Sequence, residues 1–329
     1  MQNRYKIAIV GCSGVVGRTV LKVLEEKNFR NCTYTLFASK KSAGNKIEFL
    51  GQNYIVRELK DNSFDSKFDF AIFCAGGEVS KKFAPIASST GCIVIDNSSV
   101  FRMNENVPLV VPEVNPEKIK ENNEIIANPN CSTIQAVVAL KPLDDKYNIK
   151  RIVYSTYQAV SGAGKSGIED LENGISGIAP KKFPYPIVNN CLPHIDIFMP
   201  DGYTKEEYKM INETRKILNK PNLPITATCV RVPVKNCHSE SINVEFEKEI
   251  DIYDIKILLQ NSPGIILVDD IENNYYPIAT KADGTDEVYV GRIRRDFSVN
   301  NGINLWVVSD NLRKGAASNA VQILERLIL

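Results

Sequence analysis

The chain has 329 residues, of which 43% are hydrophobic and 24% charged, an ordinary balance for a soluble globular protein. Its 40 Lys and Arg residues nearly cancel its 39 Asp and Glu residues, so no overall field selects nucleic acid or an anionic membrane. No segment approaches the ~18 apolar residues of a membrane span, and Met1–Lys6 leads into an apolar run too short for a signal peptide. We expect a cytoplasmic protein of two domains that binds its ligands at local sites.

Eight cysteines are spread along the chain, and no two have the C-x-x-C spacing of zinc knuckles or thioredoxin-type motifs. Thiols of a cytoplasmic protein stay reduced. We therefore expect free cysteines and no metal site.

Short apolar strands alternate with helical segments in the first part of the chain. A buried strand over residues 6–10 leads through a glycine-containing turn into a helical pattern of apolar residues. Further short strands are predicted at residues 33–38, 68–75, 92–96 and 109–111. This alternation predicts a doubly wound parallel sheet of the Rossmann type over residues 1–131.

The second part of the chain contains longer strands with alternating apolar and polar residues. They are predicted at residues 151–157, 225–234, 241–249, 288–297 and 303–308, with helices at 164–174 and 204–219. This pattern favours a mostly antiparallel sheet with one face covered by helices, over residues 132–311. The last apolar stripe, within residues 312–329, predicts a helix that packs back on the first domain.

Three glycines, Gly11, Gly14 and Gly17, follow the first strand and open a helix, which is the context of a dinucleotide-binding loop. Glycine permits a tight turn there, and the first helical amides can face a pyrophosphate. The spacing is G-x-x-G-x-x-G rather than G-x-G-x-x-G, and the alternative is a plain strand-to-helix turn. Residues 38–42 after the second strand contain two lysines and no acid, which favours NADP over NAD, unless this is only a solvated basic turn.

Cys131 lies where the apolar run 124–127 gives way to the helical pattern 134–140. Helix N-termini carry partial positive charge and unpaired N–H groups, which can lower the pKa of a thiol and prepare a nucleophile. The alternative is a buried cysteine that only fills space.

The second domain offers few acid–base candidates. The two histidines are His194, in a Pro-broken loop, and His238, just after a predicted strand, and a structural role is the alternative for both. Thr204 is a predicted N-cap, and Glu206 with Lys209 has the spacing of a solvated helical ion pair. Residues 162–166 resemble the end of a P-loop but lack its first glycine, and a glycine-rich loop lining a cleft is the better interpretation.

Several further motifs follow in a specific order: Gly11–Gly17, Ala38–Gly44, Ala75–Gly77, Asp96–Ser99 with Arg102, Asn128–Thr133, Gln158–Gly162, Glu206 with Lys209, Arg231 with His238, and Asn311 with Lys314–Ala317. Their order and spacing resemble the aspartate-β-semialdehyde dehydrogenase family over nearly the whole chain. The resemblance implies a Rossmann-type NADP-binding domain and an α+β domain with a mostly antiparallel sheet, like the C-terminal domain of glyceraldehyde-phosphate dehydrogenase.

The resemblance also implies a role for each site residue. Cys131 is the nucleophile, His238 the acid/base, and Gln158 orients the acyl intermediate. Arg231 pairs with the substrate α-carboxylate and Glu206 with its ammonium, and the phosphoryl group or free phosphate is held by Arg102, Asn130 and Lys209. NADP is contacted by a larger set of residues: Gly11, Ser13, Gly14, Val15, Val16, Ser39, Lys41, Ser42, Ala75, Gly76, Ser161, Gly162 and Asn311.

On this resemblance the expected reaction is the NADPH-dependent conversion of L-β-aspartyl phosphate to L-aspartate-β-semialdehyde and phosphate through a Cys131 thioester. Such a reaction belongs to the biosynthesis of lysine and diaminopimelate, methionine, threonine and isoleucine. The resemblance further implies a homodimer built through the second-domain sheet, with a tetramer as the alternative.

Two positions depart from the usual pattern of the family. Lys41 stands where an arginine is common, and lysine keeps the charge but loses bidentate geometry, so the preference for NADP is expected to be weaker. Cys12 replaces the usual Thr or Ala and should not block cofactor binding.

Three alternative functions are weighed. N-acetyl-γ-glutamyl-phosphate reductase shares the fold and chemistry, but its acetylated substrate would leave Glu206 without a cationic partner, and its cysteine context is Gly-Cys-Tyr. A glyceraldehyde-phosphate dehydrogenase would carry Ser-Cys-Thr-Thr. A non-catalytic binding homologue would not need Cys131, Gln158, Arg231 and His238 together.

Overall fold

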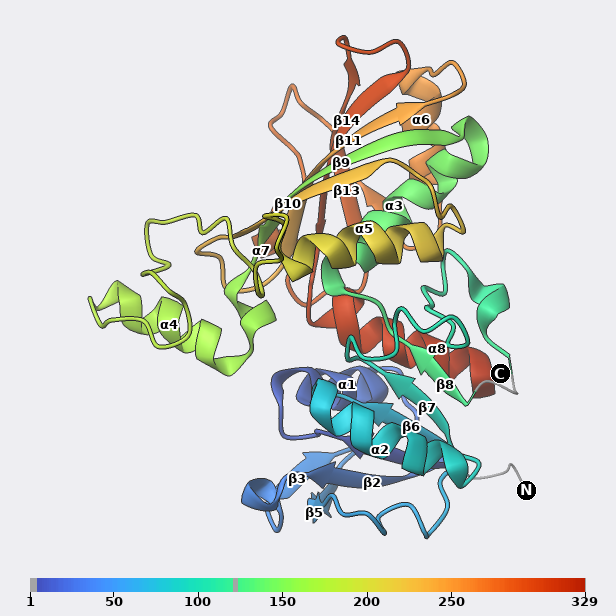
Figure 1. Ribbon diagram of the computed structural model, residues 1–329, viewed down its shortest axis with the longest axis vertical. Coiled ribbons are helices and arrows are strands. Elements are labelled where there is room, and N and C mark those ends of the chain that lie inside the picture. Colours follow the sequence, from blue (N-terminus) through green and yellow to red (C-terminus); the bar gives the residue numbers. More distant parts are fainter. Residues whose placement is uncertain (1–4, 121–123, 329) are drawn as a thin grey trace. The chain divides into compact units, whose positions relative to one another are not determined.

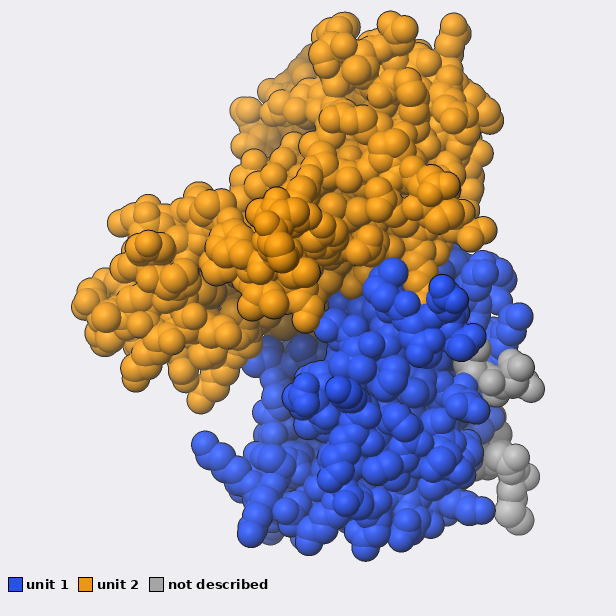
Figure 2. Space-filling view, viewed as in Figure 1, with its two compact units in different colours: residues 1–129, 316–329 blue, residues 130–315 orange. Residues whose placement is uncertain are grey.

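The computed structural model describes residues 5–120 and 124–328. The chain divides into two compact units, one of residues 1–129 with 316–329 and one of residues 130–315 (Figure 2). The expectation that no signal peptide is present rests in part on Met1–Arg4, which lie outside the described residues. No described helix is both long enough and apolar enough to cross a membrane.

The first unit is built on a six-stranded parallel sheet in the order β5-β2-β1-β6-β7-β8 (Figure 1). The central strand β1 (Tyr5–Val10) is buried on both faces: Ile7 and Ile9 belong to one apolar cluster, Ala8 and Val10 to another. A strand covered on both faces reads as a continuous apolar run, which is why residues 6–10 were recognisable. The expected doubly wound sheet is confirmed, with further strands β2 (Cys32–Ala38), β5 (Arg57–Glu58), β6 (Phe70–Phe73), β7 (Ile93–Asp96) and β8 (Ile125–Ala127).

Helices cover this sheet, and the last helix of the chain is one of them. Helix α8 (Ser318–Ile328) packs against α1 (Val15–Glu26) and contributes Ile323 and Leu324 to the cluster that contains Ile7. The prediction that the C-terminal helix returns to the first domain is therefore confirmed. The unit also contains α2 (Gly77–Ser89), the 3-10 turns Lys40–Ser42 and Pro116–Lys118, and the hairpin β3 (Lys46–Phe49) and β4 (Gln52–Ile55).

The strand predicted at residues 109–111 is wrong. Leu109 forms one isolated parallel bridge with Ala127, and no regular strand follows it. Pro108 and Pro112 flank the segment, and a proline has no N–H to donate to a ladder. The apolar run is buried, but it cannot extend its pairing in either direction.

The second unit contains a six-stranded mixed sheet in the order β10-β9-β11-β14-β13-β12 (Figure 1). The three central pairings are antiparallel, and the two outer ones, β10 with β9 and β12 with β13, are parallel. Parallel pairing requires long connections, which the segments between those strands provide. The strands are β9 (Ile149–Gln158), β10 (Ile225–Arg231), β11 (His238–Phe246), β12 (Ile265–Leu267), β13 (Val288–Asp296) and β14 (Gly302–Ser309).

Helices cover one face of this mixed sheet. Three of them pack on it, α3 (Cys131–Tyr147), α5 (Lys205–Ile217) and α6 (Ile252–Gln260). The alternate residues of β11 from His238 to Phe246 are buried, and the residues between them are half-buried, as a two-faced strand requires. The unit also contains α4 (Lys165–Ile175), α7 (Ala279–Ala282) and a 3-10 turn at Val160–Ala163, and a π-helical turn, Arg313–Ala317, begins within it.

Replacing Leu324 by alanine tests the docking of α8. Leu324 is 0% exposed in the apolar cluster, so Leu324→Ala should lower the free energy of unfolding by about 2–5 kcal/mol through lost burial and a residual cavity. Arg326→Ala, at an exposed position of the same helix, should change it by less than about 0.5 kcal/mol. Urea unfolding monitored by circular dichroism measures both values, and equal effects would contradict the packing.

Candidate functional site

Cys131 is the first residue of α3, and Asn130 caps that helix. The Asn130 side-chain oxygen accepts hydrogen bonds from the backbone N–H groups of Ser132 (3.0 Å) and Thr133 (3.2 Å). The backbone N–H of Asn130 donates to Glu213 Oε2 at 2.6 Å. Capping satisfies two of the unpaired amides, so the cysteine is held rigidly at the positive end of a 17-residue helix.

His238 faces the sulfur of Cys131, with 3.2 Å between Nε2 and Sγ. It is the first residue of β11 rather than a loop residue after a strand, because β10 already ends at Arg231. The backbone N–H of Ala159 donates to Nδ1 at 3.0 Å. In the neutral ring Nδ1 is therefore the acceptor, the proton is on Nε2, and the ring directs an N–H at the sulfur.

Burial keeps His238 neutral. Its side chain is fully buried, and desolvation together with the nearby positive charge of Arg231 lowers its pKa to about 3. The negative charge of Glu206 acts in the opposite direction but does not overcome the burial. At neutral pH the Cys131–His238 pair therefore contains an uncharged imidazole.

Glu206 and Lys209 form a buried pair rather than the solvated one that their spacing alone favours. Glu206 Oε1 accepts hydrogen bonds from Asn130 Nδ2 (2.9 Å) and Gln158 Nε2 (3.1 Å), and Oε2 accepts one from Lys209 Nζ (2.9 Å). Burial by itself would raise the pKa of Glu206, but the Lys209 charge and these donors hold it at about 2. The expected N-cap is present, since Thr204 and Glu207 form a capping box.

Arg231 ends β10 beside the histidine. Its Nη1 donates to the backbone oxygen of Ala159 at 2.6 Å, and its guanidinium lies 6.0 Å from the ring centre of Phe183. A Cβ atom placed on Gly162 would lie 3.0 Å from Nη1 and 3.3 Å from His238 Cε1, so the glycine-rich loop borders these two side chains. The second unit thus gathers a nucleophile, a neutral imidazole, two cations and one carboxylate.

The glycine loop of the first unit has the geometry of a phosphate-binding turn. Gly11 has φ +85°, and a Cβ there would lie 2.8 Å from the backbone of Ala75. Gly14 is the N-cap of α1 without a side-chain cap, so the amides of the first turn face outward beside Val15 and Val16. Ser13 and Gly14 are exposed. These features fit a pyrophosphate.

The other cofactor candidates of the first unit follow strand ends. Ser39, Lys41 and Ser42 form or flank the short turn after β2, where the first two are exposed. Ala75 and Gly76 follow β6, and Gly76 has φ +89° as the N-cap of α2. These positions border the carboxyl ends of parallel strands, where open α/β sheets bind ligands.

Three predicted residues have protein partners of their own. Arg102, in the first unit, donates from Nε to the backbone oxygen of Asn128 and from Nη2 to that of Asn97, both at 2.9 Å. In the second unit, Asn311 Nδ2 donates to Ser161 Oγ at 3.0 Å. His194 stacks on Phe198, with 4.2 Å between ring centres, and none of its described contacts is with Cys131.

Sequence reasoning missed Glu213, which helps to hold the nucleophile, and gave no role to Gly315, which belongs to the motif Lys314–Ala317. Glu213 is 1% exposed and binds the Asn130 backbone. It lies seven residues after Glu206 on α5, a helical repeat that marks the same face and could have identified it. A Cβ on Gly315 would lie 2.9 Å from Cys131 Cβ, so a side chain there would displace the cysteine. The backbone donor Ala159 left no signal in the sequence.

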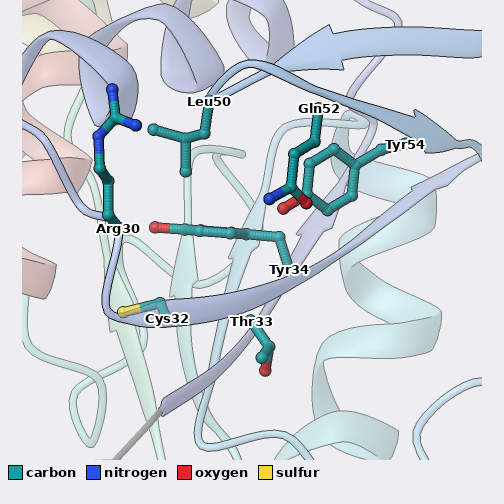
Figure 3. A pocket seen from close by; sticks show the side chains of 7 residues that line it. All are labelled: Arg30, Cys32, Thr33, Tyr34, Leu50, Gln52 and Tyr54. Atoms are coloured by element: carbon teal, nitrogen blue, oxygen red, sulfur yellow. The ribbon is translucent and has the colours of Figure 1, made fainter.

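Two other features of the described residues contain no predicted site residue. A hollow of about 420 Å³ in the first unit is lined by Arg30, Cys32, Thr33, Tyr34, Leu50, Gln52 and Tyr54 (Figure 3). In the second unit, Cys237, Asp283 and Asp310 offer atoms within 4.8 Å of one another, but Asp310 already accepts three backbone N–H groups. None of the eight cysteines forms a disulfide bond within the described part of the chain.

Known proteins resemble the whole chain. A semialdehyde dehydrogenase NAD-binding domain matches residues 6–122, and a semialdehyde dehydrogenase dimerisation domain matches residues 140–314. Aspartate-semialdehyde dehydrogenase of Aquifex aeolicus is 55% identical over 98% of both chains.

Solved structures agree with these matches. Aspartate semialdehyde dehydrogenase II of Vibrio cholerae complexed with ASA has a TM-score of 0.94 and 48% identity, over 99% of this chain and 98% of that one. The Candida albicans enzyme with NADP has a TM-score of 0.79 and 26% identity, over 99% of this chain and 100% of that one. The chain belongs to the aspartate-semialdehyde dehydrogenase family.

Proposed function

We propose that this protein is an aspartate-semialdehyde dehydrogenase, which converts L-β-aspartyl phosphate and NADPH to L-aspartate-β-semialdehyde, NADP and phosphate. The observation that carries the proposal is the 3.2 Å pair of Cys131 Sγ and His238 Nε2 beside a buried carboxylate and guanidinium. A thiolate can attack an acyl phosphate, and the two oppositely charged side chains suit an amino acid. The relatives named above bear the same enzyme name.

The chemistry would proceed at the sulfur. The Cys131 thiolate attacks the acyl carbon and expels phosphate, which leaves a thioester on the enzyme. The Nε2–H of His238 stabilises the thiolate before attack. Phosphate is a stable anion and needs no proton to leave, so in this step the neutral ring, whose Nδ1 accepts from Ala159, only donates the Nε2–H hydrogen bond. The Ser132 and Thr133 amides at the start of α3 already donate to Asn130 Oδ1, so the oxyanion is not assigned to them.

Charged side chains around the sulfur suit the other groups of the substrate. Arg231 would pair with the α-carboxylate and Glu206 with the ammonium, while Gln158, bonded to Glu206, would orient the acyl group. The phosphoryl group would be held by Arg102, Asn130 and Lys209. The ammonium would meet a carboxylate that stays ionised, because its pKa is about 2.

NADPH supplies the hydride that reduces the thioester when it is bound. The turn at Gly11, Gly14 and the start of α1 fits its pyrophosphate, and the lysine-containing turn after β2 fits a 2′-phosphate. We assign residues 1–131 with 312–329 as the dinucleotide-binding domain and 132–311 as the catalytic and dimerisation domain. The remaining cofactor contacts are proposed for Ser161, Gly162 and Asn311.

We also propose that the enzyme is a cytoplasmic homodimer. The sheet of the second unit carries an exposed Tyr157 and a half-buried Trp306 in ring contact, and this face is not the one that α3, α5 and α6 cover. A second copy would bury that face, and the tetramer is the alternative. The product would feed the biosynthesis of lysine and diaminopimelate, methionine, threonine and isoleucine.

Two assays test the proposed activity. Phosphate-dependent reduction of NADP with L-aspartate-β-semialdehyde should be observed, and N-acetylglutamate semialdehyde should react poorly because its acetylated nitrogen offers no cation to Glu206. Preference for the acetylated substrate would support the reductase alternative. No reaction with either at saturating phosphate would favour a binding protein.

Replacing Cys131 by alanine should lower kcat by at least about 10⁴-fold, because no thioester can form. Binding of NADPH, followed by its fluorescence, should be unchanged. Mass spectrometry should detect an acyl-enzyme in the wild type and none in Cys131→Ala. The exposed Cys191→Ala is the matched control and should retain full activity, whereas near-normal turnover of Cys131→Ala would refute the role of the nucleophile.

Replacing Lys41 by alanine tests the choice of cofactor. The variant should lose about tenfold in kcat/KM for NADP and almost nothing for NAD, because only NADP carries the 2′-phosphate. Lys40→Ala removes another exposed charge from the same turn and should have a smaller effect. Equal losses with both cofactors would contradict a specific contact of Lys41.

A further inference from the structure

Glu240 is a buried carboxyl group two residues after His238 on β11. Alternate residues of this strand are buried, so both side chains leave it on the same face, toward α3. Glu240 is 0% exposed, and neither of its oxygens has a hydrogen-bond partner. A carboxylate is almost never buried alone, because transfer of the charge from water has a large cost.

Gln135 of α3 is the polar side chain next to Glu240. Its Nε2 donates to the backbone oxygen of His238 at 3.3 Å, which places the amide between the two residues of the strand. Its Oε1 is buried and has no donor. An ionised Glu240 cannot supply one, since a carboxylate only accepts hydrogen bonds. One proton on Glu240 would satisfy both side chains.

We propose that Glu240 is a positioning residue that works as a protonated carboxylic acid, donating to Gln135 Oε1 while Gln135 Nε2 holds the backbone of His238. The chain of hydrogen bonds runs from β11 to the helix that begins with Cys131, and back to β11. It ties the imidazole to the helix that carries the sulfur. This role for Glu240 rests on the function proposed above, because it acts through His238.

Titratable groups that interact directly with Glu240 are uncharged. They include Tyr154 of β9 and Cys229 of β10, and burial raises the pKa of both, while the carboxylates Glu206 and Glu207 of α5 act on Cys229. His238 on the same strand is neutral because burial lowers its pKa. No ion pair of the described residues includes Glu240. Burial raises its pKa well above the ordinary value, and the nearby Gln135 side chain opposes that effect without overcoming it. The surroundings therefore favour the neutral acid.

A neutral Glu240 gives a defined dependence of stability on pH. Its pKa is raised by folding, so its contribution is complete below the unfolded pKa of about 4.3 and is lost as pH rises toward the folded value. Over that window the unfolding equilibrium constant rises by up to about tenfold per pH unit through this group. Glu240→Gln is neutral in both states and should remove that term, so its stability relative to the wild type should increase as pH rises from 5 to 8.

Variants at Glu240 separate positioning from bulk packing. Glu240→Gln keeps a donor for Gln135 Oε1 and should retain nearly the full kcat. Glu240→Leu has a similar volume but no donor, and its kcat should fall by at least about tenfold with little change in the KM for the semialdehyde. Glu245→Gln, the same substitution at a half-buried position of the same strand, is the control and should leave kcat unchanged.

Infrared difference spectroscopy of the wild type against Glu240→Gln supplies a readout that needs no activity. The wild type should show the carbonyl stretch of a protonated carboxylic acid at pH 7, and the variant should lack it. Absence of that band, a pH–stability curve shared by wild type and Glu240→Gln, or a kcat as low in Glu240→Gln as in Glu240→Leu would each overturn the proposal. If the proposed function fails, the wild type is inactive with the semialdehyde, while the band and the stability curves still report on Glu240.

Discussion

The capped N-terminus of α3 is the constraint on which the rest of the site depends. Asn130 makes three kinds of hydrogen bond: its oxygen caps the helix, its amide donates to Glu206, and its backbone N–H donates to Glu213. An N-cap contributes ~1 kcal/mol to a helix, but here it also fixes the residue before the nucleophile against α5. Cys131 therefore keeps one position relative to Glu206, and the substrate groups proposed for these two residues are held at a fixed separation.

The charges of the site are arranged so that the buried ones compensate each other. Glu206 has Lys209 as its cation, and Lys209 also donates to Asp196 at 2.8 Å. Arg231 is buried, and its Nη1 donates to the Ala159 backbone. A buried charge without partners would be costly, whereas a paired one can exchange a partner for a substrate group. The proposed recognition of an ammonium and a carboxylate is thus an exchange within a network that is already neutralised.

Long periodic segments and the glycine turn could be predicted from the sequence, because local spacing alone determines them. The strand at 6–10 and the last helix are both where the pattern placed them. Apolar content alone did not show that Leu109 forms only an isolated bridge, because the two flanking prolines prevent a longer strand. The start of β11 at His238 was missed because a polar His-Ser-Glu segment lacks the alternation that marks a strand.

The candidate site, too, could be predicted from the sequence only in part. The motifs identify Cys131 and His238, but they do not show which side chains are buried. Burial changes the interpretation of Glu206. The i, i+3 spacing of Glu206 and Lys209 predicts a solvated ion pair. In the structure Glu206 is buried and accepts hydrogen bonds from two side-chain amides, those of Asn130 and Gln158. Contacts made by backbone atoms, such as Ala159 with His238, leave no trace in residue types.

Burial acts on the two fully buried titratable groups of β11 in opposite directions, and both groups end up uncharged. It lowers the pKa of the base His238 and raises that of the acid Glu240, so both favour the uncharged form. Charged side chains near the sulfur then include Glu206, Lys209 and Arg231, each of which has a polar partner, and Glu213 on the Asn130 backbone. Because the buried side chains of β11 are neutral, the local electric field is set by those charged groups. A substrate with charges of both signs can therefore interact with them without opposing charges on β11.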